Sequence, residues 1–188
     1  VFMQFEQISS SERINLPKPS IDTGMGLERI TALLNGTNDN YNTDLFNPLI
    51  NKSIQLLNNE SLNESPSHRV IADHLRSSSF LIADGVTPSN EGRGYVLRRI
   101  MRRGMRHAHS LGNKDPIFAK MFPSLLETFQ NSFPELERAN DLILNTFLNE
   151  ETKFKETVEK GLKILEDEIS SSPKKLDGEI AFKLYDTY

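Results

Sequence analysis

The chain contains no cysteine, and its apolar residues never form a long run. The absence of cysteine excludes a disulfide framework, a thiol nucleophile and a thiolate zinc site. No apolar stretch approaches the ~20 residues that a membrane-spanning helix needs, so we expect no association with a membrane. The histidines, which are His68, His74, His107 and His109, do not have a metal-ligand spacing. We therefore expect no metal site and no zinc in this chain.

The length of 188 residues fits one large or two small domains and is sufficient for a buried core. The chain begins at Val1 inside an apolar stretch and ends at Tyr188 in the middle of a pattern. From these two ends we expect a piece of a longer protein.

Strand patterns occur only near the start of the chain. Alternation of apolar and polar residues predicts a strand over residues 1–8 and a second short strand over 20–23, with loops at 9–11 and 17–19. Gly24 and Gly26 then predict a turn into a helix over residues 27–34, which Gly36 would end.

From residue 44 onward the apolar periodicity predicts helices only. We expect them over residues 44–57, 68–83 and 94–111, over a stretch at 116–133 interrupted by Pro123, over 134–169 as one or two long helices starting at Pro134, and from 179 with Asp177 as cap. A heptad-like seam runs along 144–165, with Glu151 as its one exception. The fold class is therefore mostly α, within α+β: the last strands of a sheet precede a helical domain.

The charge is distributed unevenly along the chain. The net charge is −4, yet six of the eleven arginines lie between residues 93 and 106, and residues 134–188 carry 13 acidic against 8 basic side chains. The arginines are Arg93, Arg98, Arg99, Arg102, Arg103 and Arg106. No acidic residue lies between 92 and 112, and like charges at i,i+4 destabilise a helix. This pattern favours binding of a polyanion such as nucleic acid, and internal pairing with the acidic C-terminal helices is the main alternative.

Two further segments could bind a ligand. In residues 22–29, DTGMGLER, the two glycines allow backbone amides to approach a ligand at a helix N-terminus, where anions are favoured. An ordinary tight turn explains the same residues, since GxG is neither the dinucleotide fingerprint nor a P-loop. In residues 88–95, PSNEGRGY, Asn90 could contact a base edge, although a plain turn explains this loop as well.

Several of these segments together resemble the alanyl-tRNA synthetase family of class II aminoacyl-tRNA synthetases. IDTGMGLERI resembles motif 3 of that class, and VFMQF and LPKPSIDTG extend the similarity to the start of the chain. The block from HRVIADH to RRGMRH and the final LDGEIAFKLYDTY resemble the middle domain of the family. The resemblance is weakest over residues 113–173, where only helical character matches.

The resemblance implies an enzyme that activates alanine with ATP and Mg and transfers it to its tRNA, in the cytoplasm. Residues 1–40 would end the class II catalytic domain, and residues 41–188 would form a helical domain that reads the tRNA acceptor stem. In the first part, Val1 and Gly24 would line the alanine pocket, Asp22 would hold the ammonium, Gly26 would leave room for ATP, and Arg29 would contact adenine and phosphates as the catalytic arginine.

In the second part, the resemblance assigns Asn90 and Asp186 to the reading of a G·U wobble pair in the acceptor stem. The arginines at 93–106 would bind the phosphates. These contacts would position the RNA, while the base contacts of Asn90 and Asp186 would recognise its sequence. The chain has no counterpart of class II motifs 1 and 2, so we expect it to be inactive alone. The alternatives are a non-catalytic helical RNA-binding protein and a scaffold whose long helices bind protein.

Overall fold

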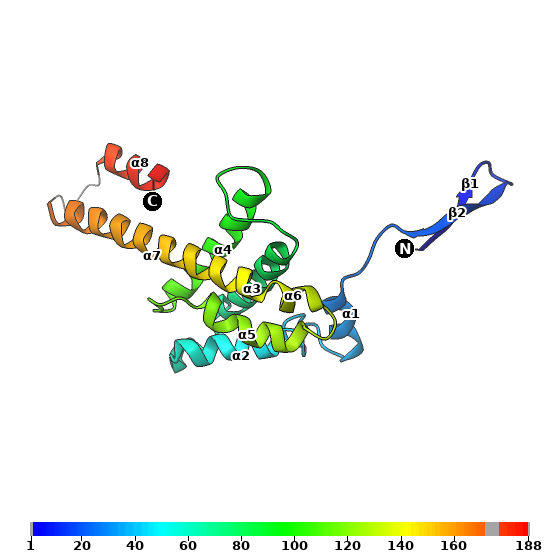
Figure 1. Ribbon diagram of the computed structural model, residues 1–188, viewed down its shortest axis with the longest axis horizontal. Helices are drawn as coiled ribbons and strands as arrows, with labels where there is room; N and C mark the ends of the chain where they lie inside the picture. Colours follow the sequence, from blue (N-terminus) through cyan, green and yellow to red (C-terminus); the bar gives the residue numbers. More distant parts are fainter. Residues whose placement is uncertain (1, 172–176, 188) are drawn as a thin grey trace. The chain divides into compact units, whose positions relative to one another are not determined.

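A computed structural model describes residues 2–171 and 177–187 of the chain. The chain divides into two compact units, residues 1–44 and residues 45–188. The first contains a two-stranded sheet and one helix, and the second is helical (Figure 1). The predicted class, mostly α within α+β, is confirmed.

The first unit opens with an antiparallel hairpin. Strand β1, Phe2–Gln7, pairs with β2, Arg13–Ile21. Both strands are exposed, with Phe2 80% and Ile21 69% accessible to solvent. A two-stranded ribbon buries too little apolar surface to be stable alone.

The second strand corrects the sequence analysis, which predicted a loop at 17–19 and a strand only from residue 20. The pairing register shifts between Met3 and Phe5, so that residues 16–19 bulge out of the ladder. Pro17 and Pro19 lie in this bulge, where a missing N–H costs no ladder hydrogen bond. Proline therefore did not end the strand.

Helix α1, Leu27–Leu34, has the bounds that the sequence predicted. Gly36, with a φ of +69°, follows its last turn. Its N–H donates to Leu33 O at 3.1 Å, and the N–H of Thr37 donates to Ala32 O at 2.9 Å. These two bonds form a Schellman motif, so the predicted role of Gly36 is confirmed.

The second unit contains helices α2 to α8 and one 3₁₀ turn (Figure 1). Their bounds are α2 Asn47–Leu57, η1 Glu60–Leu62, α3 Ser67–Ala83, α4 Gly92–Ser110, α5 Phe118–Phe129, α6 Pro134–Arg138, α7 Asn140–Ser171 and α8 Gly178–Thr187. Pro134 starts α6 as predicted, and the N–H of Glu179 donates to Asp177 Oδ1 at 2.7 Å, the predicted cap of α8. The long helix follows α6 after a break at Ala139.

Two helix predictions were inaccurate. Helix α2 begins at Asn47, three residues later than predicted. Pro48 lies in its first turn, where a backbone N–H would have no intrahelical acceptor, so proline is tolerated there. Helix α5 continues through Pro123 without interruption. Pro123 removes one intrahelical bond, and the burial of Met121, Phe122 and Leu125 around it offsets that loss, since all three are fully buried.

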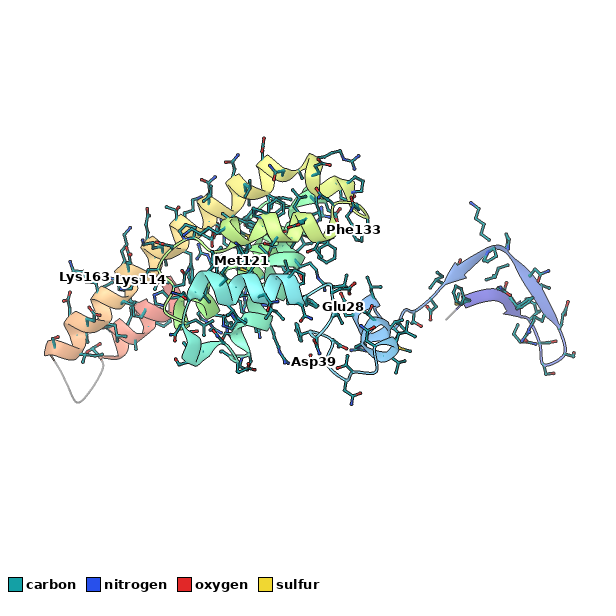
Figure 2. The ribbon with its side chains drawn as sticks, turned by 90° about the horizontal axis from the view of Figure 1, so that it is seen from below. Glu28, Asp39, Lys114, Met121, Phe133 and Lys163 are labelled. Carbon is teal, nitrogen blue, oxygen red and sulfur yellow. The ribbon has the colours of Figure 1, made fainter. Side chains whose placement is uncertain are left out.

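The core of the helical unit lies between α3, α4, α5 and α7. Leu97 and Met101 of α4 are fully buried, and Met121 of α5 lies inside the packed helices (Figure 2). The rings of Phe118 and Phe147 meet edge to face, with centroids 5.4 Å apart. The Phe118 ring also packs on Gly104 of α4, where an added Cβ would lie 2.5 Å from it. Helices α4 and α7 thus pack on the same ring of α5, which brings Arg98 and Arg102 of α4 close to Glu150 of α7.

A buried histidine joins α2 to α3. Nε2 of His68 lies 3.1 Å from Leu62 O, and because a carbonyl only accepts, this nitrogen carries the proton. Nδ1 then accepts the hydroxyl of Ser53 at 2.8 Å. Both ring nitrogens of His68 therefore bond within the protein, and burial lowers its pKa, so His68 is a neutral structural residue.

Candidate functional site

The first candidate site is the turn between β2 and α1. Asp22 and Arg29 flank it and are both exposed, with Arg29 in the first turn of α1. Gly26 has a φ of +91°, which favours glycine, and no atom lies within 4 Å of where a Cβ on Gly24 would be. A ligand can therefore approach the backbone closely at Gly24. Val1 lies outside the described residues.

The second candidate site is the loop before α4 and the exposed side of that helix. Gly94, in the first turn, packs so closely on the loop that an added Cβ would lie 2.2 Å from Thr87 O. Ser89 Oγ donates to Glu91 O at 2.8 Å. The loop is thus held against the start of α4, and Asn90 at its tip is exposed.

The six arginines separate into two groups. Arg93, Arg99, Arg103 and Arg106 are exposed, and Arg99 lies over the ring of Tyr95 at 5.8 Å. The last three follow i, i+4, i+7 spacing and so share one face of α4. They form an exposed basic stripe on the helix that Asn90 precedes.

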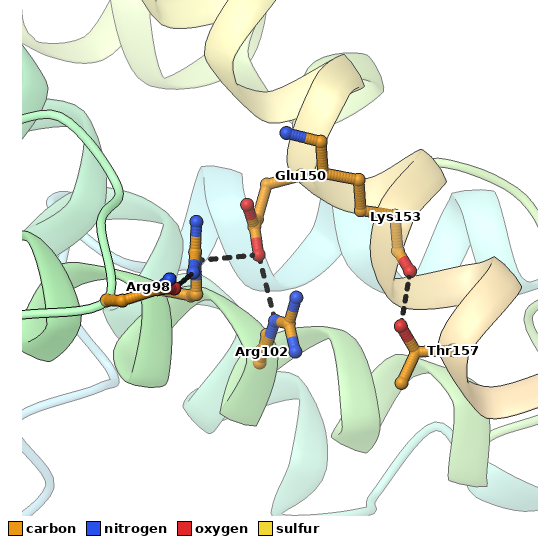
Figure 3. A network of polar contacts seen from close by, with 6 residues as sticks. Arg98, Arg102, Glu150, Lys153 and Thr157 are labelled. Atoms are coloured by element: carbon orange, nitrogen blue, oxygen red, sulfur yellow. Dashed lines mark hydrogen bonds and ion pairs between the residues drawn. The ribbon is translucent and has the colours of Figure 1, made fainter. Parts of the chain in front are cut away.

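Arg98 and Arg102 face α7 instead and pair with Glu150, which is only 3% exposed (Figure 3). Arg102 Nε donates to Glu150 Oε1 at 2.8 Å. Arg98 Nε lies 3.3 Å from the same oxygen without the alignment of a hydrogen bond. For these two arginines the structure shows the internal pairing that the sequence analysis named as the alternative to phosphate binding.

Arg98 makes a second contact that sequence reasoning missed. Its Nη1 donates to Oδ1 of Asn90, eight residues earlier. No local pattern signals this bond, because it depends on how the loop folds back on α4. It connects the exposed Asn90 to the buried Glu150 through one guanidinium group.

His107 of α4 adds little charge to the basic stripe. Burial lowers the pKa of His107, and the charges of Arg106 and Arg103 lower it further. Its Nδ1 lies 2.9 Å from Ser67 Oγ. His107 is therefore mainly neutral at neutral pH and connects α4 to α3.

The remaining predictions concern Asp186, a metal site and a membrane span. Asp186 lies in α8, and its side chain is outside the described part of the chain. Across residues 2–171 and 177–187, no three histidine, aspartate or glutamate side chains gather as a metal site would require. In the same residues, no helix combines the length and hydropathy needed to cross a membrane.

A cleft of about 400 Å³ opens between the end of α4, residues 113–117 and α7, and none of the predicted site residues lines it.

Comparison with known proteins gives the family directly. The family described as "tRNA synthetases class II (A)" matches residues 1–188. The chain is 61% identical to an alanine–tRNA ligase from Paramagnetospirillum magneticum, 59% to one from Dinoroseobacter shibae and 57% to one from Caulobacter vibrioides. Each comparison covers all of this chain and 22% of the relative. The chain therefore belongs to the class II (A) family of tRNA synthetases.

Proposed function

We propose that the chain is part of an alanine–tRNA ligase, which couples ATP to alanine and transfers the alanine to its tRNA. The observation that carries this proposal is the exposed turn with Asp22 and Arg29, together with similarity to alanine–tRNA ligases over all 188 residues. Because the chain spans 22% of the length of these relatives, the complete reaction belongs to the longer protein. We expect the 188 residues alone to be inactive, since no counterpart of motifs 1 and 2 occurs in them.

In this proposal residues 1–40 supply part of the active site. Asp22 holds the ammonium of alanine, because a desolvated ammonium needs a paired charge. Val1 and Gly24 bound a pocket for a methyl side chain, and Gly26 leaves room for ATP with its Mg. Arg29 contacts adenine and the phosphates, where a planar guanidinium both stacks and neutralises charge.

Residues 41–188 read the acceptor stem of the tRNA. Asn90 and Asp186 contact the G·U wobble pair from the minor groove, with Asp186 accepting from the guanine amino group. Arg93, Arg99, Arg103 and Arg106 bind phosphates, a role supported by their exposure. Arg98 and Arg102 contribute positive charge from the edge of this surface while pairing with Glu150.

Removing the counter-charge of the ammonium should weaken alanine activation. In the full-length enzyme, Asp22→Asn should raise the alanine requirement in pyrophosphate exchange, because losing a charged hydrogen bond costs about 1.5–3 kcal/mol. Arg29→Ala should lower adenylate formation and leave tRNA binding unchanged. Glu6→Gln, which makes the same charge change as Asp22→Asn on exposed β1, is the control. An unchanged alanine dependence in Asp22→Asn would contradict the assignment.

Neutralising the basic stripe should weaken RNA binding whatever the sequence. Replacing Arg99, Arg103 and Arg106 with Gln should reduce the slope of log affinity against log salt by roughly 0.7–0.9 for each phosphate that is no longer neutralised. The control replaces Lys153, Lys160 and Lys163 of α7 with Gln, since these are exposed as well (Figure 2 labels Lys163). Equal slopes for both triple variants would remove the stripe from the RNA interface.

The alternative is a non-catalytic RNA-binding protein, which the basic stripe alone would also suit. The two functions differ in the exchange reaction, because only a ligase exchanges pyrophosphate in the presence of alanine. RNA binding by the full-length protein without any exchange would favour the alternative.

A further inference from the structure

Asn90, Arg98, Glu150 and Arg102 form one continuous polar network that extends from an exposed loop to a buried carboxylate. Glu150 Oε1 lies 2.8 Å from Arg102 Nε and 3.3 Å from Arg98 Nε. Arg98 then donates from Nη1 to Asn90 Oδ1. Figure 3 shows Arg98 and Arg102 extending from α4 toward Glu150 on α7.

The chemistry of this network determines which way the Asn90 amide points. A guanidinium group has only donors, so the atom of Asn90 that faces Arg98 must be the carbonyl oxygen. The amino group Nδ2 then lies on the opposite branch of the amide, away from Arg98. An isolated exposed asparagine could present either its oxygen or its amino group to a base, whereas this asparagine presents a donor.

We propose that Arg98, held by Glu150, is a positioning residue that makes Asn90 read the acceptor stem as a hydrogen-bond donor. This inference rests on the function proposed above, in which Asn90 contacts the wobble pair. In the minor groove, a donor matches the acceptors pyrimidine O2 and purine N3. The uracil O2 of the wobble pair is such an acceptor, and it is displaced from the place of the cytosine O2 in a Watson–Crick pair, so a donor fixed in position distinguishes the two. The guanine amino group is left for a carboxylate.

Arginine suits this task better than lysine. Arg98 uses one nitrogen for Asn90 while another faces Glu150, so both partners are engaged by a single rigid plane. Its side chain is 23% exposed, and Glu150, at 3%, is its buried anchor. A lysine could pair with Glu150 or hold Asn90, but its point charge cannot fix both with a defined orientation.

The test compares charging of two acceptor-stem substrates that differ only in having G·U or G·C at the wobble position. The full-length enzyme carries Arg98→Lys, Asn90→Ala, both together, or Asn90→Asp. Asn90→Asp keeps the oxygen that Arg98 needs and replaces the amino group with a second, negatively charged oxygen, which accepts and cannot donate. Arg138→Lys, at an exposed arginine of α6, is the matched control for Arg98→Lys. Circular dichroism checks that each variant is folded.

We expect Arg98→Lys, Asn90→Ala and Asn90→Asp each to reduce the G·U preference in kcat/KM by roughly ten- to hundredfold, the size of one base-edge contact. The double variant should lose no more than either single one, because Arg98 acts through Asn90. Arg138→Lys should keep the full preference.

Three results would overturn the inference, and they are distinguishable. If Asn90→Ala abolishes the preference but Arg98→Lys loses activity equally on both substrates, Arg98 binds phosphate and does not position Asn90. If Asn90→Asp keeps the preference, the amino group is not the reading group. If Asn90→Ala leaves the preference intact or the unmodified enzyme has none, the proposed function itself fails, and the inference fails with it.

Discussion

Replacing Glu151 with alanine should lower the free energy of unfolding of the chain by about 2–5 kcal/mol, since each buried N–H that loses its acceptor costs about 1–3 kcal/mol. Glu151 Oε1 accepts the N–H of Ile117 at 2.6 Å and that of Phe118 at 2.8 Å, and Oε2 lies 3.3 Å from the N–H of Ala119. The side chain of Glu151, from α7, thus caps the N-terminus of α5. Urea unfolding followed by far-UV circular dichroism measures the loss.

The control for this change is Glu156→Ala, which removes an exposed carboxylate from the same helix. Its effect should be within about 0.5 kcal/mol, as for surface substitutions in general. Comparable losses in Glu151→Ala and Glu156→Ala would show that the cap contributes nothing.

The pH dependence gives a second check on Glu151. Burial raises the pKa of Glu151 above the usual 4.5, against the lowering effect of the N–H groups of Phe118, Ile117 and Ala119. The native state therefore binds the proton more tightly than the unfolded state. This contribution to stability is complete below about pH 4.5 and is lost as the pH rises through the folded pKa. Glu151→Gln, which does not titrate, should lack this component.

Glu151 also shows what a sequence pattern can and cannot predict. The heptad-like seam correctly indicated a long helix over the region of α7, because apolar periodicity records which side faces the core. Glu151 was its one exception, and the structure explains it: the carboxylate is buried because three backbone N–H groups require an acceptor there. The exception was visible in the sequence, but its partner, more than 30 residues away, was not.

The same limit applies to the candidate site. The sequence correctly predicted that Asn90 lies in a loop before an arginine-rich helix. It also named two roles for the arginines, phosphate binding and internal pairing, without deciding between them. Which arginines pair internally depends on the packing of α4 against α7, which brings Arg98 and Arg102 to Glu150. The prolines of β2 and α5 were misread for a related reason. In β2 the register shift leaves the prolines out of the ladder, and in α5 the buried side chains around Pro123 offset its missing hydrogen bond, so both outcomes depend on tertiary packing.

Removing the buried charge at Glu150 should have the second large effect. Breaking a fully buried ion pair costs about 3–5 kcal/mol. The partner guanidinium groups of Arg98 and Arg102 are 23% and 34% exposed, so solvent compensates part of the loss. We therefore expect Glu150→Gln to lower the unfolding free energy by about 2–3 kcal/mol. Urea unfolding measures it, with Glu156→Gln as the matched control on the same helix.

A second substitution separates loss of the ion pairs from a packing defect. Without Glu150, Arg98 and Arg102 are like charges at i,i+4 with no counter-ion between them, an arrangement that is itself unfavourable. Arg102→Met should therefore cost less stability in the Glu150→Gln background than in the unmodified chain, because it removes a charge that has already lost its partner. If the two costs add, Glu150 acts by filling space between α4 and α7, and its charge does not stabilise the pair of helices.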